Sequence, residues 1–493
     1  MKGDLVIRIA WRFLLCLIAL SLCGAPGAEQ SFGAAAQQIV LAGGTVIDGN
    51  GGTPLKDAIV LIEDDRIVRV GRKGQVKYTS TAKVIDMTGK YLLPGLIDMH
   101  IHYDGWMGEL FLAHGVTTVK DLGNDVEWTS AMSADIESGR VSGPRLFYVG
   151  NGLDMPPPER DHHIGLETPE MAKRAVTLLH SRGASAIKVR EKLTPELLRA
   201  IVQQARALGI PVTGHIGRTN AREAALAGIN GIEHASGIVE VTATGQLKPD
   251  KPPQNELDQF IIQLRMFSLI DLEKAKELVK FLAARKVSIV PTMSNKWRMG
   301  SERRNEFARE DAEYAKNPSL AYVPQHVRQL WATSFLFNVK DADDLAQIKE
   351  GYRKLQEMLK EFHRAGGMIT AGSDTLMSVP GLSLQRELLF LVDAGFTPME
   401  SITIATRNNA QLLGKSAELG TITPRKLADI VILDGDPLED IRNIFKVAMV
   451  IKGGKVVDTT YHANYSAPTP KPKPVRPLWV ERQLQQRSNS ATR

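Results

Sequence analysis

The hydrophobic pattern divides the chain into two β-rich ends and a longer middle in which strand-like and helix-like segments alternate. From residue 39 to about residue 89, β-branched residues alternate with polar ones between Gly-rich turns, which predicts short antiparallel strands. A second β-rich segment, GTITPRKLADIVILDGDP followed by VAMVIKGGKVVD, lies near the other end. Each segment alone is too small to form a stable domain, so we expect the two to pair into one small β-sandwich.

Between these ends, apolar strand-like runs alternate with amphipathic helix-like runs, which is the pattern of parallel βα units. The predicted strands lie near residues 92–102, 115–123, 144–150, 184–190, 210–216, 231–236, 287–293 and 368–374. The predicted helices cover 169–182, 195–208, 221–227, 272–285, 345–365 and 384–394. About eight parallel strands close a TIM barrel. The predicted fold is therefore α/β, a (β/α)8 TIM barrel over residues 91–416 with a small β-sandwich formed from residues 38–90 and 417–460.

Two further segments fall outside this pattern. Residues 295–344 are charged and weakly periodic, and they lie between the seventh and eighth predicted strands, so we expect a lid insertion over the active face. Residues 461–493 are rich in proline and polar side chains, so we expect a disordered tail.

The N-terminus has the pattern of a secretory signal peptide over residues 1–28. Basic residues precede an apolar run at 13–23 that is too short to cross a bilayer, and small residues follow at 25–28. We expect an exported protein, periplasmic or secreted, with no stable membrane span after processing. Lipidation at Cys23 is a rival, although Leu22 is bulky for a lipoprotein cleavage site, and an uncleaved anchor is a lesser alternative.

Composition and charge narrow the class of protein. The hydrophobic content of 43% and charged content of 24% are ordinary for a globular protein. The net charge is +6, but the leader carries +2 and the tail +5, which leaves −1 on the body and predicts no nucleic-acid partner. The cysteines, Cys16 and Cys23, both lie in the leader. A metal in the exported body would therefore be held by histidine, carboxylate or modified lysine.

Candidate metal ligands lie at the carboxyl ends of the predicted strands. His100 and His102 are separated by one residue, so in a strand they project from the same face. The further strand ends carry Lys188, His215, His234 and Asp374. Barrel enzymes place catalysis at this face, so these side chains are expected to converge on a metal site.

Each candidate also has an ordinary structural interpretation. The two histidines of H-x-H could lie on a half-exposed strand, and Lys188 could extend its ammonium to solvent. His215 and His234 could be hydrogen-bonded core residues, and Asp374 could cap a helix. The other histidines that we considered, His162, His163 and His180, show no strand-end placement and are left out of the metal set.

The motifs PGLIDMHIH, AIKVR, GHI, EHAS and AGSDT, flanked by a split β-sandwich, resemble the amidohydrolase superfamily over about residues 38–460. Within it, the chain is most similar to the imidazolonepropionase-like and Xaa-Pro dipeptidase (prolidase-like) branch. The resemblance implies that His100, His102 and Asp374 hold the more buried of two divalent metal ions and that His215 and His234 hold the more exposed one. It also implies that Lys188, as N6-carboxylysine, bridges the ions together with a hydroxide.

Some relatives use a single metal and lack the bridging lysine, so the presence of Lys188 favours two ions. A site of histidine and carboxylate ligands without thiolate suits Zn²⁺, with Mn²⁺ or Co²⁺ as alternatives. By the same resemblance, Asp374 takes the proton of the attacking water and passes it to the leaving amine.

The expected function is a binuclear metal-dependent hydrolase that cleaves C–N bonds of small molecules, such as amides, dipeptides or cyclic amides, and that resembles an Xaa-Pro dipeptidase. The first alternative is a lactonase or phosphotriesterase that uses the same site, because neither the fold nor the metal ions determine the substrate. A non-catalytic binding relative is an alternative of another class. A homo-oligomer is compatible with the sequence.

Overall fold

The computed structural model describes residues 37–158, 160, 162–247, 256–333, 339, 341–375 and 378–471. The chain from Gln38 onward forms one compact unit. The predicted signal peptide and the tail beyond residue 471 lie outside the described residues. Among the described helices, none is both long and apolar enough to span a membrane.

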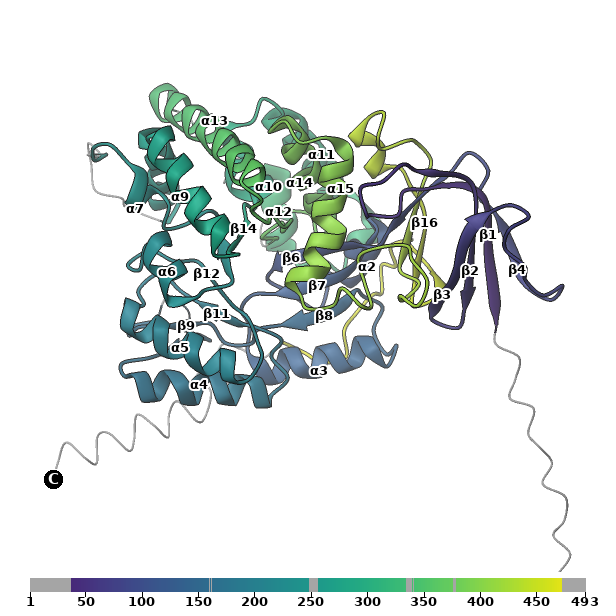
Figure 1. The fold of residues 1–493 in the computed structure, drawn as a ribbon, viewed down its shortest axis with the longest axis horizontal. Coiled ribbons are helices and arrows are strands. Elements are labelled where there is room, and N and C mark those ends of the chain that lie inside the picture. The colour runs from purple at the N-terminus through teal and green to yellow at the C-terminus, as the bar shows by residue number, and fades with distance from the viewer. Residues whose placement is uncertain are drawn as a thin grey trace, which may run out of the picture. The chain divides into compact units, whose positions relative to one another are not determined.

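Both ends of the chain contribute strands to one eight-stranded sheet. They are β1 (Gln38–Val46), β2 (Leu55–Glu63), β3 (Arg66–Arg72), β4 (Lys83–Asp86), β5 (Tyr91–Pro94), β15 (Ile430–Leu433), β16 (Val447–Lys452) and β17 (Lys455–Val457). The strand order is β17-β16-β15-β5-β1-β2-β3, and β4 pairs with β1. Because β15 runs antiparallel to β5, with Val431 opposite Leu93, the two β-rich ends of the sequence lie side by side (Figure 1).

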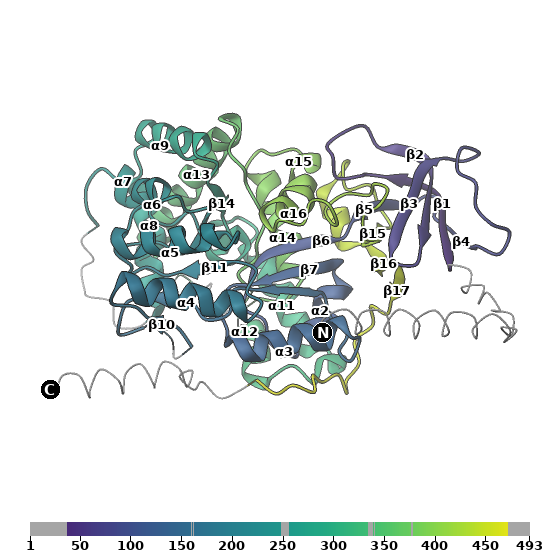
Figure 2. The same ribbon diagram turned by 60° about the horizontal axis from the view of Figure 1, so that its bottom comes forward.

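The middle of the chain supplies two groups of parallel strands (Figure 2). One group has the order β6 (Leu96–Ile101), β7 (Val116–Asp121) and β8 (Arg145–Tyr148). The other has the order β10 (Ile164–Gly165), β9 (Leu153–Asp154), β11 (Ile187–Val189), β12 (Val212–Gly214), β13 (Gly231–Glu233) and β14 (Ser288–Val290). Isolated parallel bridges join Ile289 to Ile369 and Ile101 to Thr375, so residues 369–375 link β14 to β6. The predicted α/β class is confirmed.

The segment predicted as the eighth strand, residues 368–374, is only partly extended and pairs through these single bridges. The physical reason lies in its close approach to β6. A Cβ atom at Gly372 would lie 2.9 Å from the backbone nitrogen of His100, and Asp374 has a left-handed φ of +49°. A residue in that conformation lies outside the β region, so the extended stretch ends there.

Helices follow most of the parallel strands and pack against them. They are α2 (Gly108–Ala113), α3 (Val126–Glu137), α4 (Pro169–Ser181), α5 (Pro195–Ala207), α6 (Ala221–Ala227), α7 (Val239–Thr242), α8 (Glu256–Met266), α9 (Leu272–Ala284), α10 (Met293–Lys296), α11 (Arg304–Lys316), α12 (Gln325–Thr333), α13 (Ala342–Arg364), α14 (Leu382–Asp393), α15 (Pro398–Thr403) and α16 (Asn409–Leu412). Short turns of other helix types are η1 (Phe267–Leu269), η2 (Trp297–Gly300), η3 (Pro318–Leu320), η5 (Ile404–Asn408) and η6 (Ile441–Phe445). Each of the six predicted helices is present, and Thr168 and Thr194 cap α4 and α5 just before a proline.

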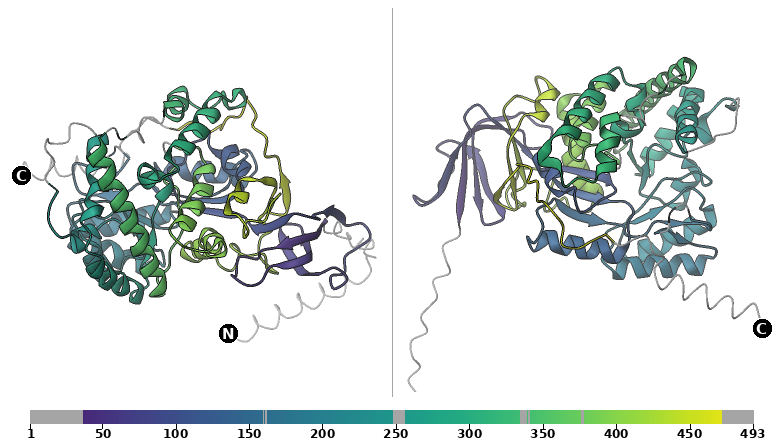
Figure 3. Two further views of the ribbon diagram at one scale, coloured as in Figure 1. Left: turned by 90° about the horizontal axis from the view of Figure 1, so that it is seen from above. Right: turned by 180° about the vertical axis from the view of Figure 1, so that it is seen from behind.

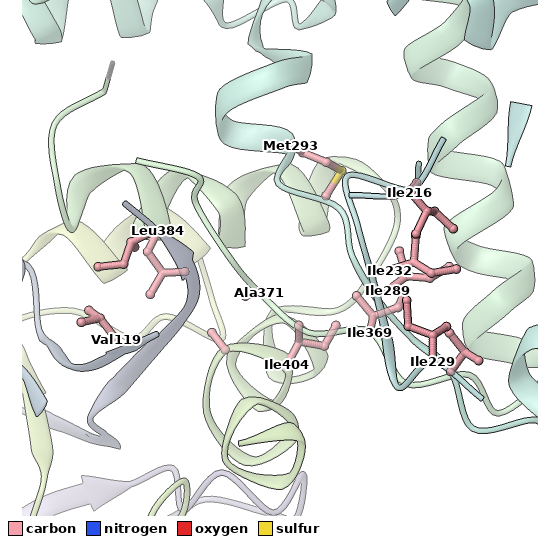
Figure 4. Packing of buried hydrophobic residues seen from close by; sticks show 14 of the residues in the cluster. Val119, Ile216, Ile229, Ile232, Ile289, Met293, Ile369, Ala371, Leu384 and Ile404 are labelled. Atoms are coloured by element: carbon pink, nitrogen blue, oxygen red, sulfur yellow. The ribbon is translucent and has the colours of Figure 1, made fainter. Parts of the chain in front are cut away.

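Strand residues alternate between two environments, as the period of two requires. One set is apolar and packs toward the helices. Figure 4 shows Ile232, Ile289 and Ile369 in this layer, and Leu384 of α14 belongs to the same cluster. The other set points into the space that the parallel strands share, and it is unusually polar. It includes Lys188, which lies between Ile187 and Val189 on β11 and is buried.

The described parts of the segment 295–344, which are residues 295–333, 339 and 341–344, are mostly helical and contact the rest of the fold through two groups of side chains. Asp311 of α11 accepts hydrogen bonds from Arg298 (2.5 Å) and Arg386 (2.7 Å), and all three side chains are buried. Removing one partner of such a buried ionic group typically costs about 3–5 kcal/mol. Trp331 of α12 packs with Leu110 in a separate apolar cluster. The lid predicted for these residues stays a prediction.

The C-terminal segment differs from its sequence-based prediction. We expected disorder from residue 461, but residues 461–471 run past α3, where Trp128 donates to the carbonyl of Thr469 (Figure 3). His462 bonds Glu109 through its Nδ1 (2.6 Å), and Lys471 donates to the carbonyl of Tyr103 (3.1 Å). For this stretch the prediction of disorder is wrong, because composition does not reveal side chains that find partners on a distant surface.

Candidate metal centre

The predicted ligands all lie at the carboxyl ends of the parallel strands. They are His100 in β6, His102 just after it, Lys188 in β11, His215 just after β12, His234 just after β13, and Asp374 in the segment between β14 and β6. Parallel strands bring such ends to one edge, which explains how residues distant in sequence become neighbours.

Asp374 is the centre of this group. Single ligand atoms from His100, His234 and Asp374 all lie within 4.8 Å of one another. The Nε2 atoms of His100 and His102 are each 3.5 Å from Asp374 Oδ1. The ring of His215 lies against that of His234, with 4.6 Å between centroids. The imidazoles and the carboxylate therefore form one contiguous set of candidate ligands.

A buried carboxylate orients His100. Its Nδ1 is 2.6 Å from Glu233 Oε2, and Thr213 donates to the other oxygen of Glu233. Burial alone would raise the pKa of Glu233, but Lys188 and His100 outweigh it and bring the pKa to about 2. The bond fixes the ring so that Nε2 faces Asp374, which is the arrangement of metal-ligating histidines with a carboxylate behind them.

The other imidazoles are held in the same manner. His234 Nδ1 is 2.7 Å from the Thr292 hydroxyl, and His215 Nε2 is 3.0 Å from Glu191 Oε1. His102 Nδ1 lies 3.4 Å from the Gly123 carbonyl. One nitrogen of His102 and one of His234 are thus engaged, and the other nitrogen of each ring is left to bind a ligand. Both nitrogens of His215 have partners, since Arg190 Nη1 lies 3.4 Å from its Nδ1.

Burial keeps these rings neutral. It lowers the pKa of His100 and of His102 and His234, and it is the main reason that the pKa of His215 falls to about 3. A neutral imidazole has a lone pair for a metal ion, so protons do not compete for these nitrogens near neutral pH.

Asp374 is fixed from two sides. The Asn295 amide donates to its backbone carbonyl (3.0 Å) and to Oδ2 (3.1 Å). Its backbone amide donates to the His100 carbonyl (2.6 Å). The preceding residue, Ser373, is held by the buried carboxylate of Asp98 through its amide (2.9 Å) and hydroxyl (2.6 Å). The left-handed conformation of Asp374 is therefore maintained by its surroundings.

Lys188 is the unexplained member of the site. It is 1% exposed, and its Nζ has no hydrogen-bond partner among the described residues. Burial lowers the pKa of its ammonium to about 7, while Glu233 acts in the opposite direction. An orphaned amine at this position is costly unless a further group binds to it.

Sequence reasoning missed the residues behind the ligands. Glu233 precedes His234 directly, and a charged residue inside the apolar strand GIE was a usable signal. Glu191 directly follows the AIKVR motif, whereas Thr292 and Asn295 follow β14, one of the strands for which we predicted no ligand. Nothing in the sequence pairs these two with His234 and Asp374.

Residues 91–457 match the Amidohydrolase family, so the chain belongs to this family. The chain is similar to a candidate prolidase from Bifidobacterium longum, at 25% identity over 92% of this chain and 99% of that one, with a TM-score of 0.62. A Xaa-Pro dipeptidase with methionine bound in its active site shares the fold, at 23% identity over 86% of this chain and 100% of that one, with a TM-score of 0.61.

Among curated relatives, an adenine deaminase from Chelativorans sp. is 26% identical over 207 residues, which are 38% of this chain and 34% of the deaminase. The chain spans less than two thirds of the length of the curated relatives it matches. The resemblance to the amidohydrolase superfamily and to its prolidase-like branch is confirmed.

Replacing Glu233 with glutamine is expected to weaken zinc binding about 10–100-fold, the usual cost of losing a carboxylate behind a ligating histidine. Glutamine keeps the size of the side chain but loses the charge that holds His100 Nδ1. A competition titration against a chromogenic chelator measures the change. Glu277→Gln, an exposed position on α9, is the control and should bind zinc like the native protein. Equal affinity in both variants would show that Glu233 does not orient the ligand.

Proposed function

We propose that this protein is a binuclear metal-dependent hydrolase that cleaves C–N bonds in small molecules, with amides, dipeptides or cyclic amides as the substrate class. One observation carries the proposal. His100, His102 and His234 converge on Asp374, while Glu233 and other partners hold their second nitrogens. Such a set is prepared for a cation, and the family of the chain supports hydrolysis as its use.

The residues present fit two divalent ions. His100, His102 and Asp374 would hold the inner ion, and His215 and His234 the outer one. Ligands of nitrogen and oxygen without sulfur favour zinc, as expected from the sequence. Lys188, with its unpartnered Nζ, would join the two positions as N6-carboxylysine, which turns an ammonium into an anion. This modification would give the orphaned amine a function and remove the cost of burying it.

The reaction requires a nucleophile and a proton carrier. Divalent ions, when bound, lower the pKa of water and polarise a carbonyl group. Asp374 takes the proton of the attacking water at its carboxylate and delivers it to the nitrogen of the leaving amine. Asn295 holds this carboxylate in place by its bond to Oδ2. The amide of the substrate is thereby cleaved to a carboxylic acid and an amine.

We further propose that an eight-stranded barrel is closed by seven of the parallel strands and by residues 369–375, the seven being β6, β7, β8, β11, β12, β13 and β14, and that the sheet formed by the chain ends folds into a sandwich. The hydrogen bond from Ser185 to the Tyr148 carbonyl (2.8 Å) and the bridges at Ile369 and Thr375 support closure. The basic and apolar pattern of residues 1–28 supports export.

Metal analysis joined to a hydrolysis screen tests the proposed function. We expect about two divalent ions per chain, loss of activity with a strong chelator, and recovery on addition of zinc. The screen compares dipeptides, N-acyl amino acids and cyclic amides with lactones and phosphotriesters. Turnover of lactones or phosphotriesters alone would show that the protein is a lactonase or phosphotriesterase and that it does not cleave C–N bonds. Absence of bound metal in an active preparation would refute it.

A further inference from the structure

The turn at residues 292–295 follows β14, includes the start of α10 and contacts the candidate metal centre at two places. The Thr292 hydroxyl is 2.7 Å from His234 Nδ1. The Asn295 amide donates to the backbone carbonyl of Asp374 (3.0 Å) and to its Oδ2 (3.1 Å). In the proposed function, His234 is a ligand of the outer ion and Asp374 a ligand of the inner one. A single turn therefore supports one ligand of each ion.

Thr292 holds a strained backbone conformation in this turn. Its φ is +50°, in the left-handed region that a β-branched residue rarely adopts. Its side chain is buried, and its hydroxyl donates to the carbonyl of Pro291 (2.8 Å). The hydroxyl therefore accepts the proton of His234 Nδ1, which leaves the lone pair of that ring on Nε2. A conformation of this kind persists only where the surrounding structure holds it.

Glu387 of α14 supplies such a restraint. Its Oε1 accepts a hydrogen bond from the backbone amide of Met293 (2.9 Å), its Oε2 accepts one from that of Ser294 (2.6 Å), and its side chain is fully buried. Consecutive amides beside a left-handed residue form a concave site for oxygen acceptors, so these two bonds favour the conformation of Thr292. Burial raises the pKa of Glu387 to about 8, while the two amides act in the opposite direction. In either protonation state the side chain presents two oxygens to the turn.

We propose that Glu387 is a positioning residue for both halves of the metal centre, because it holds the turn at residues 292–295 in the conformation that contacts His234 and Asp374. This inference rests on the proposed function for the assignment of the two ions. Loss of the Glu387 side chain would leave two buried amides without acceptors, and the turn would relax toward an ordinary backbone conformation. The Thr292 hydroxyl and the neighbouring amide side chain would then move away from the two ligands, so both ions would bind more weakly.

Zinc affinity of the full-length protein, measured by competition with a chromogenic chelator, tests this inference. Glu387→Met removes both acceptors at a similar side-chain size and should weaken each zinc-binding step about tenfold, a usual cost of losing a partner behind a ligand. Glu387→Gln keeps one acceptor and should lose less. Gln385→Met is the matched control, because Gln385 is also buried on α14 and donates to two backbone carbonyls, those of His114 (3.1 Å) and Ile444 (2.8 Å). It should lower the unfolding temperature but bind zinc like the native protein.

A double-mutant cycle with Asn295→Ala separates positioning from a general loss of stability. In the native background, Asn295→Ala should weaken binding of one zinc ion about tenfold. In Glu387→Met the same change should have little further effect, because the turn has already left its position. If Glu387→Met does not fold, Glu387→Gln replaces it in the cycle and should show a smaller coupling of the same sign.

These measurements need no turnover, so they separate the inference from the proposed function. A loss of zinc affinity in Glu387→Met that Gln385→Met does not share, together with coupling to Asn295→Ala, would support the inference even if the native protein cleaved no C–N bond. Unchanged affinity in Glu387→Met, an equal loss in Gln385→Met or additive losses in the cycle would overturn it. So would a native protein that binds no zinc.

Discussion

Replacing Asp374 with asparagine is expected to lower turnover about a hundredfold or more while the protein keeps its metal. Asparagine preserves the size of the side chain and one ligand oxygen, but it cannot accept the proton of the attacking water. Amide substrates should suffer more than activated esters, because an amine must be protonated to leave and a nitrophenolate need not be. Steady-state rates on both substrate types, together with metal analysis, measure this difference.

Asp64→Asn is the matched control for this experiment. Asp64 lies in the turn between β2 and β3 and has a φ of +52°, close to the +49° of Asp374, so the backbone demand on asparagine is the same. This variant should keep full activity. If Asp374→Asn retained full rate on an amide with metal bound, another residue would have to transfer the proton. If it lost the metal, Asp374 would serve as a ligand and structural residue.

The second large effect is expected for Lys188→Ala, which should abolish assembly of a two-metal centre. Loss of the proposed bridging anion would remove several kcal/mol of charge stabilisation, which corresponds to a loss of activity on the order of a hundredfold to a thousandfold. Lys188→Arg should fail as well, because a guanidinium cannot bridge two cations. Metal content and rate are measured together, in buffer with and without added bicarbonate.

Short carboxylic acids provide the specific readout for this variant. Acetate or propionate can enter the space left by Lys188→Ala and partly restore both metal and rate. Lys120→Ala is the matched comparison, because Lys120 is also a buried lysine on a parallel strand and also acts on Glu233. Short acids should not rescue it. Near-native activity in Lys188→Ala would show that this lysine has an ordinary structural role and does not bridge metal ions.

The site could be predicted from sequence as far as strand geometry determines it. His100 and His102 share a face because they are two residues apart, and the remaining candidate ligands lie at the ends of strands of the same direction. The helices could also be predicted where a threonine followed by a proline marks the first turn, as at Thr168 and Pro169. Short-range rules act on neighbouring residues, and a single sequence displays them directly.

What could not be predicted depends on contacts between distant segments. Asn295 reaches Asp374, and Thr292 reaches His234, only because β14 lies between the segments that carry those ligands. Disorder of the C-terminal segment near His462 was predicted from its composition. Composition indicates whether a segment can fold by itself, but it does not indicate which surface of the protein the segment contacts.

The pairing of β5 with β15 has a consequence for how the protein is made. Tyr91 leaves the ribosome long before its partner Leu433, and at about 5–20 residues per second the delay is on the order of half a minute. Throughout that time one edge of β5 has no neighbour from its own chain, and such an edge invites pairing with other nascent chains. We therefore expect the yield of native protein to depend on chaperones that shield the N-terminal strands until translation ends.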